Sequence, residues 1–148
     1  MKDFPVSERL VRLIEKNADE LTRSYIRDIK NQTHMPTYQG WNEKEVYERA
    51  FVVYSQLGKW ISQSTTQQEV QDFWTDLGRE RRREGFVLSE IIQAIHLVRK
   101  QLWKKIQSEG LLDNAVDLLL AMDLFDHVTL FFDRAVLHAV RGYESQKP

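Results

Sequence analysis

The stretch from Asp113 to Tyr143 carries apolar side chains at helical spacing around about half of its circumference. A helix with so wide an apolar surface is usually contacted on several sides by other helices. The whole chain has only six glycines and three prolines, which favours long helices over short strands and turns. We therefore predict an all-α fold in which this last helix is the central element and the other helices cover it.

The rest of the sequence divides into further helical segments joined by short polar breaks. Asn42 and Thr66 are each followed three residues later by glutamate, which is the spacing of a capping box at a helix start. Gly85 suits the left-handed position after a helix end. We predict one domain over residues 1–148, a bundle of about five helices, with a globin-like arrangement as the alternative. The expected helices cover about 7–32, 42–61, 66–84, 88–109 and 113–143.

Composition excludes several classes of function. The net charge of −1 provides no basic field for nucleic acid. The absence of cysteine removes disulfides, thiolate nucleophiles and zinc fingers. The longest apolar runs, 50–54 and 118–122, are far shorter than the ~20 residues of a membrane helix, and the N-terminus lacks the apolar segment of a signal peptide. We therefore expect a cytoplasmic protein that binds neither nucleic acid nor membrane.

Polar residues in the first and third predicted helices allow two interpretations each. Asn17 lies near the centre of an apolar stripe. It is either a buried amide that is hydrogen-bonded to its neighbours or a contact for a ligand. Arg79, Arg82 and Arg83 lie at a helix end, where cations complement the helix dipole. They form either a solvated end with local ion pairs or a site for an anion or an acidic partner.

The helix expected over 88–109 has the clearest apolar seam in the chain, and one charge interrupts it. Arg99 either packs its stem and pairs with an acid, or directs a cation at an anionic ligand or partner. His96 and Trp103 lie on the shoulder of the seam. Leu97 points the opposite way and indicates a second contact surface.

No acid, base and nucleophile can be grouped from the sequence, so we predict no enzyme. None of the four histidines has an acid three residues earlier, as carboxylate-bridged metal bundles require. Asp123 and His127 are one turn apart, but both lie in the polar sector of their helix. We accordingly predict no catalytic residue, no metal and no cofactor.

The segment from Gly85 to Trp103, with the arginines of 79–83 before it, resembles the N-terminal domain of RsbRD-type RsbT co-antagonist proteins. Those proteins are stressosome components, and similar domains precede sensor histidine kinases. The likeness is most specific over 78–103. It implies a cytoplasmic, all-helical signal-input module without catalysis, whose output lies in a following domain such as a STAS domain or in a partner protein. Related stressosome sensors resemble globins without haem, hence the globin-like alternative.

The resemblance also implies a homodimer. This agrees with apolar residues that lie outside the main apolar face of the last two predicted helices. Packing such residues across a two-fold axis would bury them on both copies. The candidates are Leu97, Leu119, Leu130 and Leu137.

Two further hypotheses concern small molecules and phosphate. His96 is the better placed candidate for a haem ligand. His138 to Gly142 faintly resembles the His-x-x-Lys-Gly of histidine phosphotransfer domains, with arginine in place of lysine. The supply of aromatic residues makes a small-ligand pocket feasible; these are Tyr47, Phe51, Trp60, Trp74 and Trp103.

Overall fold

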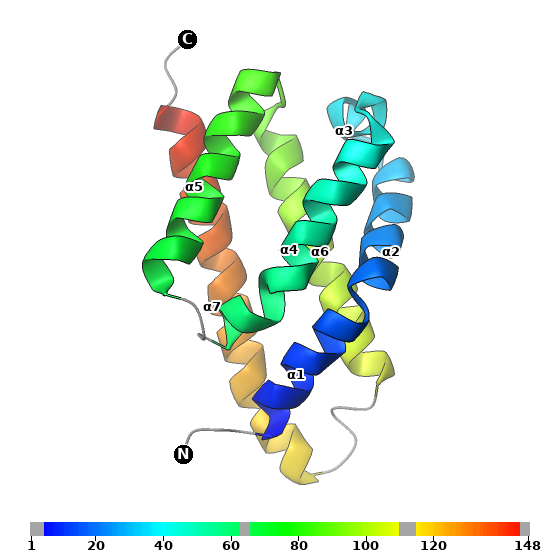
Figure 1. The fold of residues 1–148 in the computed structure, drawn as a ribbon, viewed down its shortest axis with the longest axis vertical. Helices are drawn as coiled ribbons and strands as arrows, with labels where there is room; N and C mark the ends of the chain where they lie inside the picture. The colour runs from blue at the N-terminus through cyan, green and yellow to red at the C-terminus, as the bar shows by residue number, and fades with distance from the viewer. Residues whose placement is uncertain (1–4, 63–65, 110–114, 146–148) are drawn as a thin grey trace.

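The computed structural model describes residues 5–62, 66–109 and 115–145, without the side chains of 5–7, 115–121 and 124. The described part contains seven α-helices and no strand, which confirms the all-α fold class (Figure 1). The helices are α1 (Pro5–Lys16), α2 (Ala18–Lys30), α3 (Pro36–Gly40), α4 (Glu43–Ile61), α5 (Gln67–Glu84), α6 (Leu88–Ser108) and α7 (Ala115–Ser145).

The number of helices differs from the expected five. The first predicted helix is divided at Asn17, whose backbone (φ −111°, ψ 19°) is not helical. The Asn17 Nδ2 group donates a hydrogen bond of 2.8 Å to the Leu13 carbonyl. The Asn17 backbone N–H donates to the same carbonyl at 3.1 Å, so the side chain adds a second bond at the break. Asparagine favours such local side-chain bonds and is a poor residue for a helix interior. The expected loop over 33–41 contains the short helix α3.

The predicted helix ends are confirmed where they depend on neighbouring residues. Asn42 Oδ1 accepts a hydrogen bond from the backbone N–H of Glu45 at 3.0 Å, and Thr66 caps α5 in the same way. Gly85 ends α5 in the left-handed conformation with φ of +94°. The Glu45 carboxylate accepts from the Trp41 indole instead of returning to the cap, so that capping box is only half formed.

The middle of the fold is formed by α4 and α6. Figure 1 shows these two helices between the α5–α7 pair and α2. Both contribute side chains without exposure, among them Tyr54 of α4 and Leu102 of α6. The Tyr54 hydroxyl donates to the Val98 carbonyl at 3.1 Å, which ties the two helices together. The core is therefore organised around α4 and α6.

The prediction that the last helix is central is wrong. One face of α7 is buried, through Val128, Phe132 and Ala135. Its opposite side is open, and Leu130 and Leu137 are 49% and 44% exposed. Periodicity shows which residues share a helix face, but it does not show whether another element of the chain covers that face.

Two glycines bring α5 and α7 into backbone contact. A Cβ atom added to Gly78 would lie 2.0 Å from the Ala139 carbonyl oxygen, and one added to Gly142 would lie 2.0 Å from the Thr75 carbonyl oxygen. The absence of a side chain at both positions therefore permits the close crossing of the two helices.

Candidate functional site

A cavity of about 240 Å³ lies between α2, α4, α5 and α6, and we call it the inner cavity. Its only strongly buried charged lining residue is Arg81, which is 7% exposed. The Arg81 guanidinium lies 3.4 Å from the Glu84 carboxylate and over the ring of Phe86. Arg49 also binds Glu84, through two hydrogen bonds of 3.0 and 2.6 Å. The cations at this cavity are thus already paired within the chain.

Tyr38 lines the same cavity and is held there as a neutral phenol. Burial raises the pKa of Tyr38 to about 12, and the nearby Arg81 opposes that rise. A phenol with so high a pKa remains protonated throughout the physiological range. Tyr38 therefore adds a polar group but no charge to the inner cavity.

The buried carboxylate of Glu90 fixes α3 against α6. Glu90 is 2% exposed and accepts hydrogen bonds from the backbone N–H groups of Thr37 and Tyr38 at 2.9 and 3.2 Å. Its second oxygen accepts from the Thr37 hydroxyl at 2.8 Å. These donors include the first free N–H groups of α3, which a carboxylate satisfies well.

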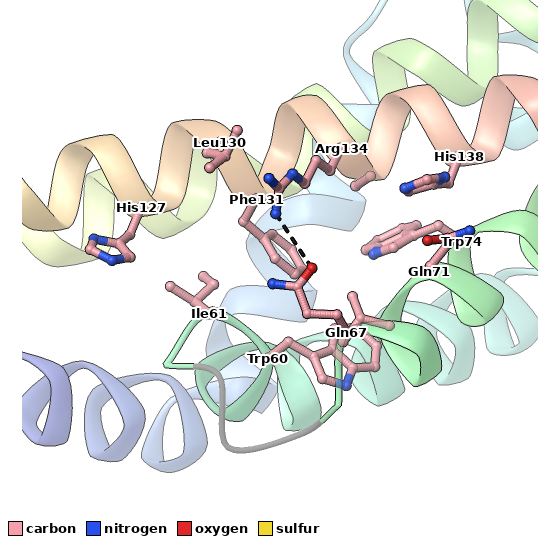
Figure 2. Close-up of a pocket in the computed structure, with 12 residues that line it drawn as sticks. Trp60, Ile61, Gln67, Gln71, Trp74, His127, Leu130, Phe131, Arg134 and His138 are labelled. Atoms are coloured by element: carbon pink, nitrogen blue, oxygen red, sulfur yellow. Dashed lines mark hydrogen bonds between the residues drawn. The ribbon is translucent and has the colours of Figure 1, made fainter.

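A second space opens between the end of α4, α5 and α7, and we call it the aromatic pocket (Figure 2). It has a volume of about 80 Å³ and is open to the surface on one side. The Trp74 ring is roughly perpendicular to that of Phe131, with centroids 6.2 Å apart, and lies 6.0 Å from Trp60. The lining residues are Trp60, Ile61, Gln67, Val70, Gln71, Trp74, His127, Leu130, Phe131, Arg134, Ala135 and His138.

Trp74 carries the one buried polar side-chain atom of the described part that lacks a hydrogen-bond partner, its indole Nε1. The residue is 2% exposed, and its side chain points into the aromatic pocket from α5 (Figure 2). Trp74 also borders the inner cavity, so its ring separates the two spaces. Buried N–H groups are nearly always paired, so this donor calls for an acceptor.

The mouth of the aromatic pocket is electropositive. Arg134 of α7 donates to the Gln67 side chain across the opening at 3.5 Å (Figure 2). His127 and His138 lie on the same helix, and none of the described residues that line the pocket is acidic. Burial, together with Arg141 and Arg134, lowers the pKa of His138, so this histidine is neutral near pH 7. The charge at the opening therefore comes mainly from Arg134.

The arginines singled out in the sequence lie at the other end of the α5–α7 pair. Arg82 donates to the Tyr143 carbonyl at 2.9 Å and lies over the ring of that residue, and Arg79 reaches the Ser145 hydroxyl at 3.3 Å. Arg83 is exposed. Arg79 and Arg82 therefore hold the end of α7 on α5.

The candidates on α6 are not brought together into one site. His96 is exposed and Arg99 beside it is half-buried, and neither lines a described cavity. Leu97 is 7% exposed and belongs to the core, so it offers no second contact surface. Trp103 packs against Phe125 of α7 with ring centroids 5.3 Å apart.

Sequence reasoning did not select Arg81 and Glu90, and it placed Trp74 only among general pocket aromatics. A signal for Arg81 was present, because Trp74, Gly78 and Arg81 are spaced as one helix face. All three are buried in α5. Spacing alone therefore distinguishes Arg81, which shares a helix face with Trp74, from the neighbouring arginines that face solvent.

Lowering the pH from 7.5 to 5 should destabilise the fold partly through His96 and His138. Burial and neighbouring arginines lower the pKa of both histidines, although His96 is only partly covered and Asp133 opposes the shift there. Below about pH 6.5 the unfolded chain takes up protons before the folded chain does, so stability falls as the pH drops through the lowered folded pKa. We expect a smaller drop in Tm for the double variant His96→Gln, His138→Gln than for the parent. His34→Gln is the control and should show the same drop in Tm as the parent. If the double variant also shows the same drop as the parent, this assignment is contradicted.

The described residues contain no cluster of three histidine, aspartate or glutamate side chains suited to a metal ion. Among the helices built from those residues, none is long and apolar enough to cross a membrane.

The described residues thus form an all-helical arrangement with two pockets between its helices. The chain belongs to the RsbT co-antagonist protein rsbRD N-terminal domain family, whose family model matches residues 32–147. This membership makes it a regulatory domain of stress signalling and confirms the resemblance seen over 78–103. Helices α1 and α2 precede the matched region. Comparison with curated proteins and with solved structures finds no match.

Proposed function

We propose that this chain is a non-catalytic, cytoplasmic signal-input domain that acts as a homodimer in a bacterial stress or two-component system. In this role it passes its signal to a downstream signalling domain or to a partner protein. The family match over residues 32–147 carries the proposal. The signal would shift the population between two packings of the helices, which is how binding at one place changes an interface at another.

The dimer surface that we propose is the outer face of α7, defined by Asp126, Leu130, Leu137 and Arg141. All four side chains are exposed. Leu130 and Leu137 are two helical turns apart and point in the same direction. Exposed leucines in such a row are typical of a surface that a partner covers. Leu119 was a further candidate, but its side chain lies outside the described residues.

The charges on the outer face of α7 favour a second copy of this chain as the occupant. In an antiparallel pair centred between positions 133 and 134, Leu130 is level with the partner's Leu137. The same centre places Asp126 level with the partner's Arg141. One two-fold axis therefore aligns apolar residues with apolar residues and an acid with a base, as a self-complementary surface requires.

Leu137→Asp should convert the dimer into a monomer. A buried apolar anchor at an interface is worth 2 kcal/mol or more, so the dimer Kd should rise at least about thirtyfold. Sedimentation velocity over a range of micromolar concentrations measures this change. Val87→Asp is a matched control, because Val87 is 52% exposed and lies at the start of α6. A parent protein that remains monomeric at high micromolar concentration would exclude the dimer.

A charge reversal tests the antiparallel arrangement itself. Arg141→Glu and Asp126→Arg should each weaken association, and the double variant should recover much of the loss, because the acid and the base have exchanged places. No recovery in the double variant would exclude this arrangement even if the protein is dimeric.

We do not propose a haem or a phosphotransfer function. His96 lines none of the described cavities, and His138 faces the aromatic pocket and is half-buried. The small-ligand interpretation is supported by the unpaired Trp74 donor and is developed below.

A further inference from the structure

We propose that the aromatic pocket binds a small organic carboxylate whose apolar body is no larger than about one ring. The Trp74 indole N–H donates to a carboxylate oxygen, and Arg134 holds the negative charge at the mouth. This inference names the input of the proposed signal-input domain, and it rests on that function for the role of the ligand as a signal.

The position of Trp74 supplies the first argument. Its Nε1 atom is buried without a partner, while its ring packs against Phe131, Trp60 and Phe73 on several sides. The ring is therefore held by neighbours, but its one polar atom is left without an acceptor. Because this atom is closed off from solvent, a ligand oxygen reaches it once neighbouring pocket side chains shift. The oxygen then satisfies the donor through a direct hydrogen bond in a dry environment.

The charge around the pocket supplies the second argument. Arg134 lies at the opening and donates only a long hydrogen bond of 3.5 Å to the neutral Gln67 side chain. No acid is present among the described lining residues, and the nearby Asp123 carboxylate lies 3.5 Å from the imidazole of the lining residue His127. A guanidinium binds a carboxylate through two parallel donors, which makes this anion a suitable partner.

The volume restricts the size of the ligand. An engineered protein cavity of about 150 Å³ encloses one benzene ring. The aromatic pocket has about 80 Å³ and opens to the surface, so it encloses part of a ring and leaves the rest at the mouth. Larger polycyclic molecules do not fit without separation of α5 and α7.

The inner cavity is larger but chemically less suited to an anion. Arg81 and Arg49 share the carboxylate of Glu84, so neither offers an unpaired cation. Glu80 also lines that space and would repel a second carboxylate. Arg134 lines the aromatic pocket and does not line the inner cavity, so a substitution of Arg134 distinguishes binding in the two spaces.

The site is also placed to influence the proposed dimer. Leu130 lines the aromatic pocket and belongs to the outer face of α7. A ligand that contacts α7 from the pocket side therefore changes the helix that carries the dimer surface. The pocket and the dimer surface are connected directly, because the same turn of α7 contributes residues to both.

Benzoate is the probe for the first experiment, with toluene as the neutral molecule of matching ring size. The chain has four tryptophans, so a ¹H–¹⁵N spectrum of the intact protein contains up to four indole signals. We expect the Trp74 indole signal to move saturably with millimolar benzoate, while that of Trp103 stays in place. Toluene should bind at least about tenfold more weakly, because it provides no acceptor. Equal binding of toluene, or no saturable movement with benzoate, would overturn the proposal.

Two variants test the assigned groups by calorimetric titration with benzoate. Trp74→Phe keeps a ring but loses the donor, and affinity should fall about tenfold, whereas Trp103→Phe should leave it unchanged. Arg134→Gln should also weaken benzoate several-fold, with the exposed Arg27→Gln as its control. If Trp74→Phe fails to fold, the Arg134→Gln result decides alone. Unchanged affinity in Arg134→Gln would overturn the proposal.

The failure of this inference is distinguishable from the failure of the dimer. The Leu137→Asp protein should bind benzoate as the parent does, because Leu137 lies outside the pocket. Benzoate binding to a protein that never dimerises would leave the site intact and contradict only the dimer. A dimer without benzoate binding would contradict only the site.

Discussion

Alanine at Gly78 or Gly142 will lower the free energy of unfolding by about 3 kcal/mol, because each new Cβ forces α5 and α7 apart. The added atom would lie 2.0 Å from a carbonyl oxygen of the facing helix, far inside any van der Waals contact. The obstructing atoms belong to the backbone of Ala139 and Thr75, so no side chain can rotate away to make room. The gain in helix propensity of roughly 1 kcal/mol offsets only part of this cost.

Urea denaturation followed by circular dichroism measures these losses. Gly40→Ala is the control, since a Cβ at Gly40 has no atom within 4 Å, and its effect should stay within about 0.5 kcal/mol. Gly58→Ala should be intermediate, because its Cβ would lie 2.9 Å from the Val11 Cα atom. If Gly78→Ala and Gly40→Ala prove equally stable, the close crossing of α5 and α7 is wrong.

Glu90→Ala will cost about 3 kcal/mol or more, because it leaves two backbone N–H groups and one hydroxyl without their acceptor. Each unpaired buried donor costs roughly 1–3 kcal/mol, and part of this is recovered where water reaches Thr37 and Tyr38. Glu90→Gln should cost less, about 1–2 kcal/mol, since the amide retains one acceptor oxygen.

The loss at Glu90 should appear as release of α3 together with lower global stability. Limited proteolysis within 31–42 and chemical denaturation report on these two effects. Thr37→Ala removes only one of the three donors and should cost about 1 kcal/mol. Glu48→Ala, at an exposed position of α4, is the control and should be nearly neutral. A Glu90→Ala protein as stable as this control would show that the carboxylate does not hold α3.

The features predicted correctly from the sequence depend on residues a few positions apart. The caps at Asn42 and Thr66 and the left-handed Gly85 each involve partners within four residues, so local spacing is sufficient. The family resemblance was visible over 78–103, and the family model extends the match to residues 32–147. The break at Asn17 was missed, because the apolar spacing continues through it.

The candidate sites were harder to predict because they join distant segments. Glu90 and Thr37 are 53 positions apart, and no short motif connects them. The aromatic pocket needs α4, α5 and α7 to meet, and the unpaired state of Trp74 Nε1 depends on every neighbour of the ring. Arg81 and Arg83 are both in α5, but the Arg81 side chain points to the core and the Arg83 side chain points to solvent.

The amino-acid order alone was enough for the all-helical class, most helix ends and the family, since these follow from local geometry and from residue patterns. Only the folded arrangement placed α7 at the edge, since identical apolar spacing is compatible with a covered helix and an open one. It also produced the close contact at Gly78 and Gly142 and the pocket beside Trp74. Those features arise from contacts between segments far apart in the chain, and short-range spacing carries no information on such contacts.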